Sequence, residues 1–310
     1  MHETRRAVLD ALASGPVSGP ELAAQLDISR NAVWKHVDAL RGAGFEIESR
    51  KAGYALVSIP EFGGPAVQYG LEAPYDVEFH ESIPSTNARA RERAEAGDTN
   101  VVVLADEQTG GRGRLDRAWA SPSGGIWCSL LVRPDFPAAH APIATLAAAV
   151  AVTEAVATVG VDAGIKWPND VLVGDRERKL AGILTEMAGE HDRIEWLIVG
   201  IGLNANIDPE TLPTGATSLR GLVGDVDRRE LIQPMLDRLA EHLRSPQSVL
   251  DAWKDHSLTL GQRVRVETPA ETVVGEAVDV TFPGTLVIEH EGERRTVTAG
   301  DCEHLRPIDD

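Results

Sequence analysis

The sequence predicts an α+β protein of more than one domain, and three observations lead to this prediction. The chain has 310 residues, about twice the length of a typical domain of roughly 150 residues. Its formal net charge of −18 arises wholly downstream of residue 60, because the first 60 residues hold seven basic and seven acidic side chains. The hydrophobic pattern changes from short helices to mixed helices and strands, and then to short strands alone. We therefore predict three domains, at residues 1–60, 61–258 and 259–310.

The first domain has the pattern of three short helices followed by a hairpin. Apolar side chains recur at helical spacing in three successive segments. Ser18 or Gly19 can form the N-cap of the second helix, and Ser29 that of the third. Two alternating segments then flank Lys51-Ala52-Gly53, as the two strands of a wing do. This pattern predicts a winged helix-turn-helix.

The third helix of this domain has a polar and basic side that is typical of DNA recognition. The N-terminal part of a recognition helix enters the major groove most deeply, so we expect Arg30, Asn31 and Lys35 to contact bases or phosphates. The neutral charge of this domain favours the same interpretation, because the rest of the chain repels polyanions. The alternative is a small helical adaptor with a solvated face.

The second domain follows a linker at 58–66 that is rich in proline and glycine. Strand-like and helix-like runs are mixed in it, which predicts a sheet with helices packed against it. The expected strands are 101–104, 126–132, 164–167, 171–173 and 196–201. The expected helices are 87–96, 143–159 and 228–243.

Two segments of this domain carry hydrogen-bonding and cationic groups. Ser85-Thr86-Asn87 places two hydroxyls and an amide at a helix start, where they can cap the helix or receive a small polar group. In the segment from Asp106 to Arg114, three glycines let a ligand approach the backbone, while Arg112 and Arg114 supply forks for carboxylate or phosphate. Helix capping alone and a solvated glycine loop are the respective alternatives.

Two further segments carry lysines, in a chain that has only five of them. Lys166-Trp167-Pro168-Asn169-Asp170 brings a lysine, an amide and a carboxylate to the end of a strand, a combination that suits phosphate groups and Mg²⁺. Lys179 precedes an apolar strand, and Asn204 ends a strand that contains glycines. Because lysines are scarce, we expect the two in these segments to act as compact point charges, which arginine cannot replace.

The third domain consists of short alternating strands separated by glycines. These strands are expected at 263–266, 278–280, 285–288 and 295–298. The pattern predicts a small all-β domain.

The order of these motifs behind a winged helix resembles the family of bifunctional biotin-protein ligases that also act as biotin operon repressors. The resemblance spans nearly the whole chain, and the GRGR and KWPND motifs are its most specific part. It implies a central mixed sheet related to that of lipoate ligases and a C-terminal β-barrel of the SH3 type. It also implies a reaction in which biotin and ATP give biotinyl-5′-adenylate and pyrophosphate, after which a lysine of a biotin carboxyl carrier protein takes the biotinyl group. The implied partners are this carrier, operator DNA and, once the adenylate is bound, a second copy of the chain.

The resemblance also assigns roles to the matching residues. Those implied to be catalytic are Lys179, Arg114 and Lys166. Those implied to bind biotin are Ser85, Thr86, Asn87, Gln108, Arg112, Gly113, Arg114, Lys179 and Gly182. Those implied to bind ATP or the adenylate are Arg112, Arg114, Trp119, Lys166, Asn169 and Asn204. Asp170 is implied to hold Mg²⁺.

One position departs from the family pattern. The family commonly has glycine after the residues that match Arg114-Leu115, and this chain has Asp116. We expect a stiffer loop, and weaker retention of the adenylate unless Arg117 pairs with the added carboxylate. Two other functions stay open at this point, a lipoate ligase and a metabolite-sensing regulator without catalysis.

Composition bounds the class of protein. Cys128 and Cys302 lack the spacing of a zinc site or a disulfide framework, so a disulfide-built mini-protein is excluded and a reducing cytosol is expected. The chain has no run of about 18 uninterrupted apolar residues, so we expect a soluble cytoplasmic protein without a membrane partner. The acid excess with few lysines is typical of adaptation to a salty cytosol.

Overall fold

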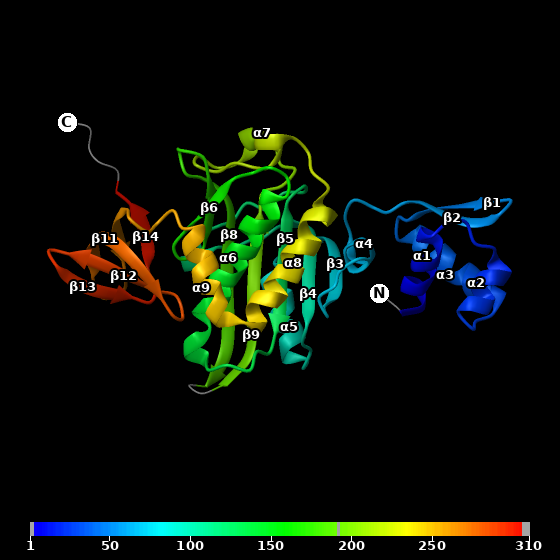
Figure 1. Ribbon diagram of the computed structural model, residues 1–310, viewed down its shortest axis with the longest axis horizontal. Coiled ribbons are helices and arrows are strands. Elements are labelled where there is room, and N and C mark those ends of the chain that lie inside the picture. Colours follow the sequence, from blue (N-terminus) through cyan, green and yellow to red (C-terminus); the bar gives the residue numbers. More distant parts are fainter. Residues whose placement is uncertain (1–2, 191–192, 306–310) are drawn as a thin grey trace.

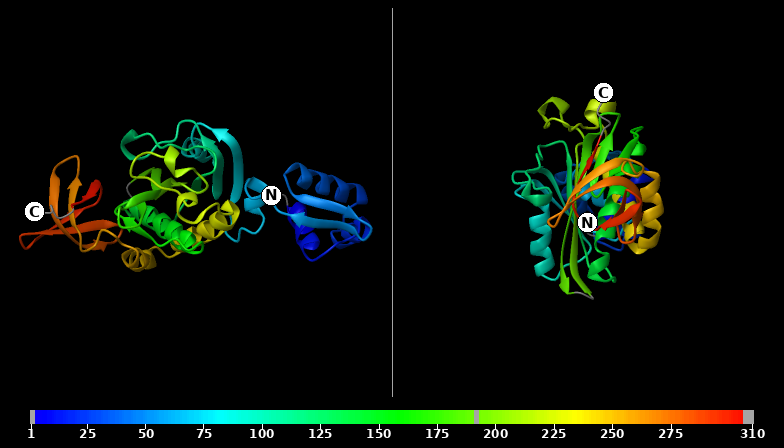
Figure 2. Two further views of the ribbon diagram at one scale, coloured as in Figure 1. Left: turned by 90° about the horizontal axis from the view of Figure 1, so that it is seen from above. Right: turned by 90° about the vertical axis from the view of Figure 1, so that its left-hand side faces the viewer.

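The computed structural model describes residues 3–190 and 193–305, and it arranges them as three lobes in a row (Figure 1). The outer ends of the first and last predicted domains lie outside these ranges. The view from above shows the same order, with a helical lobe at one end, a large sheet in the middle and a small β-lobe at the other end (Figure 2).

The N-terminal lobe is a winged helix-turn-helix, as predicted. Its elements are α1 (Glu3–Ala13), α2 (Gly19–Gln25), α3 (Arg30–Gly42), β1 (Glu46–Arg50) and β2 (Gly53–Ser58). Ser18 and Glu21 form a capping box, in which each side chain accepts a hydrogen bond from the other residue's N–H group. The Ser29 hydroxyl accepts the Ala32 N–H group at 3.1 Å. These caps fix the two helix starts on which the expected recognition face depends.

The central lobe contains a seven-stranded mixed sheet, which confirms the predicted fold class. Its order is β3-β4-β5-β9-β8-β7-β6, in which β3 and β4 are parallel and all other neighbours are antiparallel. The strands are β3 (Asp76–Ile83), β4 (Val101–Gln108), β5 (Ile126–Val132), β6 (Ala163–Lys166), β7 (Asp170–Val173), β8 (Arg178–Glu190) and β9 (Arg193–Leu203).

Helices cover both faces of this sheet. One face is covered by α5 (Thr86–Glu95), which contacts β4, β5 and β9. On the other face, α6 (Pro142–Ala157) packs under α8 (Arg228–Arg244) and α9 (Val249–Asp255), as the end-on view shows (Figure 2). Two short helices, α4 (Gly64–Gln68) and α7 (Arg220–Val223), complete the lobe.

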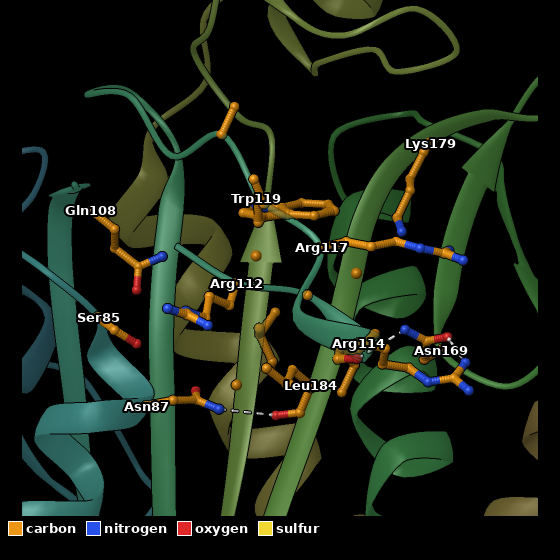
Figure 3. A pocket seen from close by; sticks show the side chains of 18 of the residues that line it. Ser85, Asn87, Gln108, Arg112, Arg114, Arg117, Trp119, Asn169, Lys179 and Leu184 are labelled. Atoms are coloured by element: carbon orange, nitrogen blue, oxygen red, sulfur yellow. Dashed lines mark hydrogen bonds between the residues drawn. The ribbon is translucent and has the colours of Figure 1, made fainter. Parts of the chain in front are cut away.

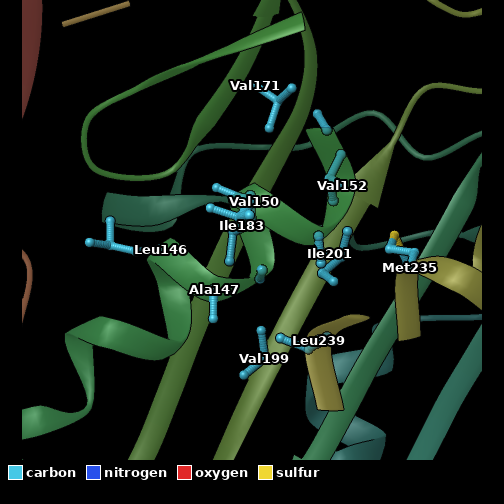
Figure 4. Packing of buried hydrophobic residues seen from close by; sticks show 14 of the residues in the cluster. Leu146, Ala147, Val150, Val152, Val171, Ile183, Val199, Ile201, Met235 and Leu239 are labelled. Atoms are coloured by element: carbon cyan, nitrogen blue, oxygen red, sulfur yellow. The ribbon is translucent and has the colours of Figure 1, made fainter. Parts of the chain in front are cut away.

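Helix α6 forms the centre of the hydrophobic core. Its Val150 lies beside Ile183 of β8, while Met235 and Leu239 of α8 lie on the side of Ile201 and Val199 of β9 (Figure 4). The segment Ala138–Ala157 is long and apolar enough to cross a membrane by composition, but 72% of its window is buried inside the protein. A helix that is apolar on all sides is expected in such a core.

The C-terminal lobe is a five-stranded antiparallel sheet, so the predicted small all-β domain is confirmed. Its order is β13-β12-β11-β10-β14. The strands are β10 (Arg263–Glu267), β11 (Thr272–Thr281), β12 (Thr285–His290), β13 (Glu293–Val297) and β14 (Asp301–His304).

Several elements differ from those expected. Strand β3 was not expected, because its sequence DVEFHESI lacks an apolar run and lies at the sheet edge with mostly half-buried side chains. Strand β9 is longer than the predicted 196–201, since Arg193 and Glu195 interrupt the apolar pattern at its N-terminal end although the pairing with β8 continues there. Strand β14 was also missed, for its four residues include three polar ones.

Candidate active site

A pocket of about 800 Å³ lies over the face of the sheet that α5 covers. It is lined by the start of α5, the end of β4, the glycine-rich and arginine-rich segment after β4, parts of β7, β8 and β9, and the loop 212–216 (Figure 3). The structure brings most of the predicted site residues to this pocket. They are Ser85, Thr86, Asn87, Gln108, Arg112, Gly113, Arg114, Trp119, Asn169, Asp170, Lys179, Gly182 and Asn204.

One end of the pocket is built mainly from neutral hydrogen-bonding groups, beside the Arg91–Glu186 ion pair, whose carboxylate accepts the Asn87 side-chain N–H group at 2.8 Å. The carbonyl oxygen of the Gln108 side chain accepts both the N–H group of Thr86 at 2.8 Å and its hydroxyl at 3.0 Å. The Ser129 hydroxyl lies 2.5 Å from Asn87 Oδ1 and 2.7 Å from Thr86 Oγ1. Ser85 caps α5 by accepting the Ala88 N–H group at 3.3 Å. The motif Ser85-Thr86-Asn87 therefore both caps helix α5 and forms the polar end of the pocket.

Glycines on β8 and β9 form the floor. A Cβ atom on Gly200 would lie 2.2 Å from Asn87 Oδ1, and one on Gly202 would lie 2.7 Å from Trp119 Nε1. The Trp119 ring also rests on Gly182, where an added Cβ would meet it at 3.1 Å. Because these glycines have no side chains, Trp119 and Asn87 can lie close to the sheet.

Lys179 stands at the cationic end of the pocket. Its Nζ atom lies 2.7 Å from Asp170 Oδ1 and 5.0 Å from the centre of the Trp119 ring. Lys179 is therefore a fixed positive charge at the edge of the glycine floor (Figure 3).

Asn204 offers a hydrogen-bonding group to the pocket from a buried position. It is 2% exposed, and its side-chain N–H donates to the Thr217 carbonyl at 2.9 Å. Its Oδ1 atom has no hydrogen-bond partner among the described residues, and neither has Trp119 Nε1. Buried polar atoms without partners are costly, so both are suited to a polar ligand.

The segment from Gly111 to Trp119 is a small hairpin, which we call the arginine hairpin. The N–H group of Trp119 donates to the Gly111 carbonyl at 2.9 Å, and that of Gly113 donates to the Arg117 carbonyl at 2.8 Å. At its tip, Leu115 and Asp116 both have positive φ angles, of 54° and 56°. The expectation that Asp116 stiffens this loop stays a prediction, but glycine would adopt this conformation with less strain.

The arginines of this hairpin have separate partners. Arg112 pairs with Asp116 at 3.0 Å, so the carboxylate of Asp116 is offset by Arg112 and not by Arg117. Arg117 instead pairs with Asp301 of the C-terminal lobe. Arg114 donates to Asn169 Oδ1 at 3.0 Å and to the Gly300 carbonyl at 2.7 Å. The C-terminal lobe therefore contributes to the rim of the pocket.

Lys166 lies apart from the other predicted residues. It lines a second pocket of about 250 Å³ between the central sheet and the C-terminal lobe. Arg114, Asn169 and Asp170 line both pockets, so they stand between Lys166 and the main one. Lys166 pairs with Asp170 across β6 and β7 at the sheet edge, and its pocket is also lined by Arg265, Glu267 and Cys302 of the C-terminal lobe.

Comparison with known proteins connects this pocket to a family. The central lobe matches the Biotin/lipoate A/B protein ligase family over residues 79–204, the N-terminal lobe matches an HTH domain over 4–55, and the C-terminal lobe matches the Biotin protein ligase C terminal domain over 259–305. The bifunctional ligase/repressor BirA of Bacillus subtilis is 36% identical over 93% of this chain and 93% of its own length. The chain belongs to the biotin protein ligase family.

Two further biotin protein ligases support this assignment. The biotin--[acetyl-CoA-carboxylase] ligase of Mycobacterium tuberculosis is 39% identical over 72% of this chain and 86% of its own length. The structure of the Aquifex aeolicus biotin protein ligase with biotin and ATP superposes with a TM-score of 0.62, at 28% identity, over 74% of this chain and 99% of that one.

Sequence reasoning missed several residues that line this biotin protein ligase pocket or support its lining residues. Ser129 lies inside an apolar strand, where its single hydroxyl gives no pattern. The loop 212–216 has no motif, yet the N–H group of Lys179 donates to its Gly215 carbonyl at 2.8 Å. Asp301 lies more than 180 residues from the arginine hairpin, so only the fold brings it there. Cys128 also lines the pocket, where burial raises the pKa of its thiol to about 12 and leaves it unreactive.

The predicted DNA-contacting residues lie together on the exposed side of α3. Arg30, Asn31 and Lys35 are all exposed, and so is Trp34 beside them. Arg41 on the same helix is not available for DNA in the same way, because its guanidinium donates to the Ile47 carbonyl at 2.6 Å and to the Ser49 hydroxyl at 3.1 Å in the wing.

Proposed function

We propose that this protein activates biotin with ATP and attaches it to a lysine of a biotin carboxyl carrier protein. The observation that carries the proposal is the polarity of the main pocket. A neutral hydrogen-bonding end at Thr86, Asn87 and Gln108 and a cationic end at Lys179 lie on either side of a glycine floor. Biotin has the same polarity, with an uncharged ureido ring at one end and a carboxylate at the other.

In the first step, a carboxylate oxygen of biotin attacks the α-phosphorus of ATP, and the bond to pyrophosphate breaks. Lys179 would stabilise the carboxylate and then the acyl phosphate, and Arg114 and Lys166 would stabilise the phosphates. The ureido ring would be held by Ser85, Thr86, Asn87 and Gln108, while Arg112, Gly113 and Gly182 would enclose the rest of biotin. Adenylate contacts would come from Trp119, Asn169 and Asn204. In the second step, the carrier lysine amine attacks the acyl carbon and AMP leaves.

Asp170 fits a Mg²⁺ ion that arrives with ATP. The described residues hold no group of three or more His, Cys, Asp or Glu that could bind a metal by themselves. Mg²⁺ is often bound through one or two carboxylates together with substrate phosphates, and Asp170 supplies one carboxylate at the pocket. Binding the ion there would free Lys179 from its ion pair with Asp170. The ion would neutralise phosphate charge.

We also propose that the N-terminal lobe represses transcription in response to biotin. Arg30, Asn31 and Lys35 would contact operator DNA, and two adenylate-bound copies would form a symmetric dimer on a palindromic site. Both proposed activities would be carried out in the cytoplasm, where a carrier protein and operator DNA would be accessible together.

The experiment that tests the ligase function uses mass analysis of a carrier domain. The domain is incubated with the protein, ATP and Mg²⁺, and with biotin, lipoate or neither. We expect one added biotinyl group only in the biotin reaction. Addition of lipoyl would indicate a lipoate ligase, and no modification in any reaction would indicate a regulator without catalysis.

A further inference from the structure

A buried histidine of the C-terminal lobe connects two turns of the central sheet. His304 is the last residue of β14, and its side chain is only 5% exposed. Its Nδ1 atom lies 2.8 Å from Glu177 Oε1, and its Nε2 atom lies 3.0 Å from Thr259 Oγ1. The hydroxyl oxygen of Thr259, a buried residue, accepts the N–H group of Trp167 at 2.9 Å. These four residues form one continuous set of contacts, which we call the His304 network.

The hydrogen bonds of the His304 network run in one direction. A carboxylate only accepts hydrogen bonds, so the ring nitrogen that faces Glu177, Nδ1, carries a hydrogen. The Thr259 oxygen accepts the Trp167 N–H group, and its own hydrogen is then directed at Nε2 of His304. The neutral imidazole with its hydrogen on Nδ1 therefore gives each of these polar groups a partner, as buried polar groups require.

The two ends of the His304 network lie at opposite ends of strand β7. Trp167 belongs to the turn between β6 and β7, and its ring N–H group also donates to the Gly284 carbonyl of the C-terminal lobe at 2.9 Å. Glu177 closes the turn between β7 and β8, where its N–H group donates to the Gly174 carbonyl at 2.9 Å. The C-terminal lobe thus holds both of the turns that border β7.

Strand β7 benefits from this support because of its length and position. β6 and β7 have four residues each, and β6 is the outermost strand of the sheet. Local opening of a folded protein concentrates in segments with few supporting contacts, and strands this short make few ladder hydrogen bonds. The Lys179–Asp170 ion pair lies in this region, since Asp170 begins β7 and Lys179 lies opposite Leu172 in β8. A shift of β7 would therefore move the carboxylate relative to the ammonium group.

We propose that His304 is a positioning residue that keeps the Lys179–Asp170 ion pair in place. The inference rests on the proposed function for its effect on adenylate formation, whereas the support of β7 is a property of the folded protein alone. It gives the C-terminal lobe a role in the first chemical step, because the His304 network ends two residues before the lysine that would stabilise the acyl phosphate.

The first test is hydrogen exchange of the full-length protein without substrates, followed by mass spectrometry. His304→Ala should speed exchange of the β7 amides several-fold, because their protection depends on how often this part of the sheet opens. Lys254→Ala is the matched control, since it removes a different contact between the two lobes, the 2.7 Å pair with Asp279. Exchange of the β4 amides reports whether the whole lobe unfolds. Unchanged β7 exchange in His304→Ala, or an equal rise in both variants, would overturn the proposal.

A second pair of variants changes the other end of the His304 network and leaves the C-terminal lobe intact. Glu177 is 29% exposed in a turn, so Glu177→Ala should fold, and it should speed β7 exchange as His304→Ala does. Glu177→Gln should retain most of the protection, because its amide oxygen can accept the same Nδ1 hydrogen. Equal exchange in the alanine and glutamine variants would contradict a role for this hydrogen bond.

The third test is single-turnover adenylate formation from biotin and ATP. His304→Ala and Glu177→Ala should each slow this step about tenfold, since small misplacement of a catalytic group costs this much or more. The double variant should be no slower than either single variant, because both remove one network. The Kd for biotin should change little, since the neutral end of the pocket lies on α5, β4 and β5. Additive losses, or a wild-type rate in both variants, would contradict positioning. If the wild type forms no adenylate, the proposed function fails, and the exchange test still decides whether His304 supports β7.

Discussion

Lys179 is held between a carboxylate and an aromatic ring, so its charge has a defined place before any substrate arrives. Its Nζ atom lies 2.7 Å from Asp170 and 5.0 Å from the centre of the Trp119 ring. In a protein with five lysines, this one lies in the main pocket. The proposed reaction needs a point charge here, because negative charge passes from a carboxylate to an acyl phosphate at one place.

Replacing Lys179 with alanine should slow adenylate formation by about 10²-fold or more, the cost of removing a donor that stabilises a transition state. Single-turnover kinetics with biotin and ATP measure this rate. Lys254→Ala is the control, because Lys254 also lies 2.7 Å from an aspartate, but in α9. Near wild-type adenylation by Lys179→Ala would remove Lys179 from the mechanism.

Gly200 should not tolerate a side chain, because its missing Cβ leaves room for Asn87. An alanine at this position would put a methyl group 2.2 Å from Asn87 Oδ1. We expect Gly200→Ala to weaken biotin binding by about tenfold or more, since such crowding costs over 1 kcal/mol. Calorimetric titration measures the Kd. Gly42→Ala, with nothing within 4 Å of the added Cβ, should bind biotin as the wild type does, and an unchanged Kd for Gly200→Ala would refute the role of the floor.

The sequence predicted which residues reach the pocket, but it did not predict which residues they contact there. The motifs containing Asn87, Gln108, Arg114 and Lys179 all reach one pocket, because each is short and lies at a strand or helix end. Their contacts with Ser129 and Asp301 were not predictable, since these depend on strand register and on how the lobes pack. The position of Lys166 was not predictable either, because its motif spans the border between the two pockets.

One carboxylate on β3 ties helix α5 to the sheet edge, in addition to the packing of Ala90 and Ala94 against the sheet. Glu78 accepts hydrogen bonds from Arg89 at 2.6 Å and from Arg93, and it lies 2.8 Å from His80. Partial burial acts to raise the pKa of Glu78, but the hydrogen bonds from Arg89, His80 and Arg93 outweigh it and hold the pKa at about 2. This cluster fixes α5, whose first turn carries Thr86 and Asn87.

Glu78→Gln should lower the free energy of unfolding by about 2 kcal/mol at pH 7, because it removes hydrogen bonds to a charged group. Since the pKa of Glu78 is depressed by folding, its contribution is present above pH 4.5 and is lost as the pH falls towards 2. The wild type should therefore lose its advantage over Glu78→Gln in that interval. Urea unfolding at several pH values measures this difference. Glu81→Gln, an exposed position on the same strand, is the control, and a constant difference from pH 7 to pH 2 would contradict the assignment.

Elements with strong local patterns were the ones that could be predicted. The caps at Ser18 and Ser29 and the apolar core helix α6 follow from propensity and periodicity alone. Strand β3 could not be predicted, because its sequence is polar. It lies at the edge of the sheet, and its Glu78 forms ion pairs with Arg89 and Arg93 of α5. Such a strand is defined by its neighbours and not by its own hydrophobicity.

Specific contacts join the DNA-binding lobe to the ligase lobe. The Nε atom of Arg228 in α8 lies 3.0 Å from Oε1 of Glu61 in the linker, and its Nη1 atom lies 2.6 Å from Oδ1 of Asp106. Asp106 belongs to β4, which leads into the pocket. The Tyr69 ring of the central lobe packs edge-on against Phe45 of the winged helix, at 6.3 Å between centroids. These contacts give the pocket and the N-terminal lobe a physical connection.

DNA binding by a single copy should be weak, because α3 presents few exposed cations and the rest of the chain is acidic. We expect biotin with ATP to raise affinity for the protein's own control region by favouring a dimer. Arg30→Ala and Lys35→Ala should abolish retardation and leave adenylation unchanged, and Arg294→Ala in the C-terminal lobe should affect neither. Mobility-shift titration at the salt concentration of the host cytosol measures this. An affinity that does not respond to ligand would leave only the ligase function.

The central claim is that the main pocket makes an acyl-adenylate, and its most direct test omits the carrier protein. The protein is mixed with ATP and Mg²⁺, with and without biotin, and released pyrophosphate is followed before the bound product is identified by mass. We expect a stoichiometric burst of pyrophosphate that requires biotin, together with biotinyl-5′-adenylate retained on the protein. Absence of a burst, or a burst of the same size without biotin, would contradict it.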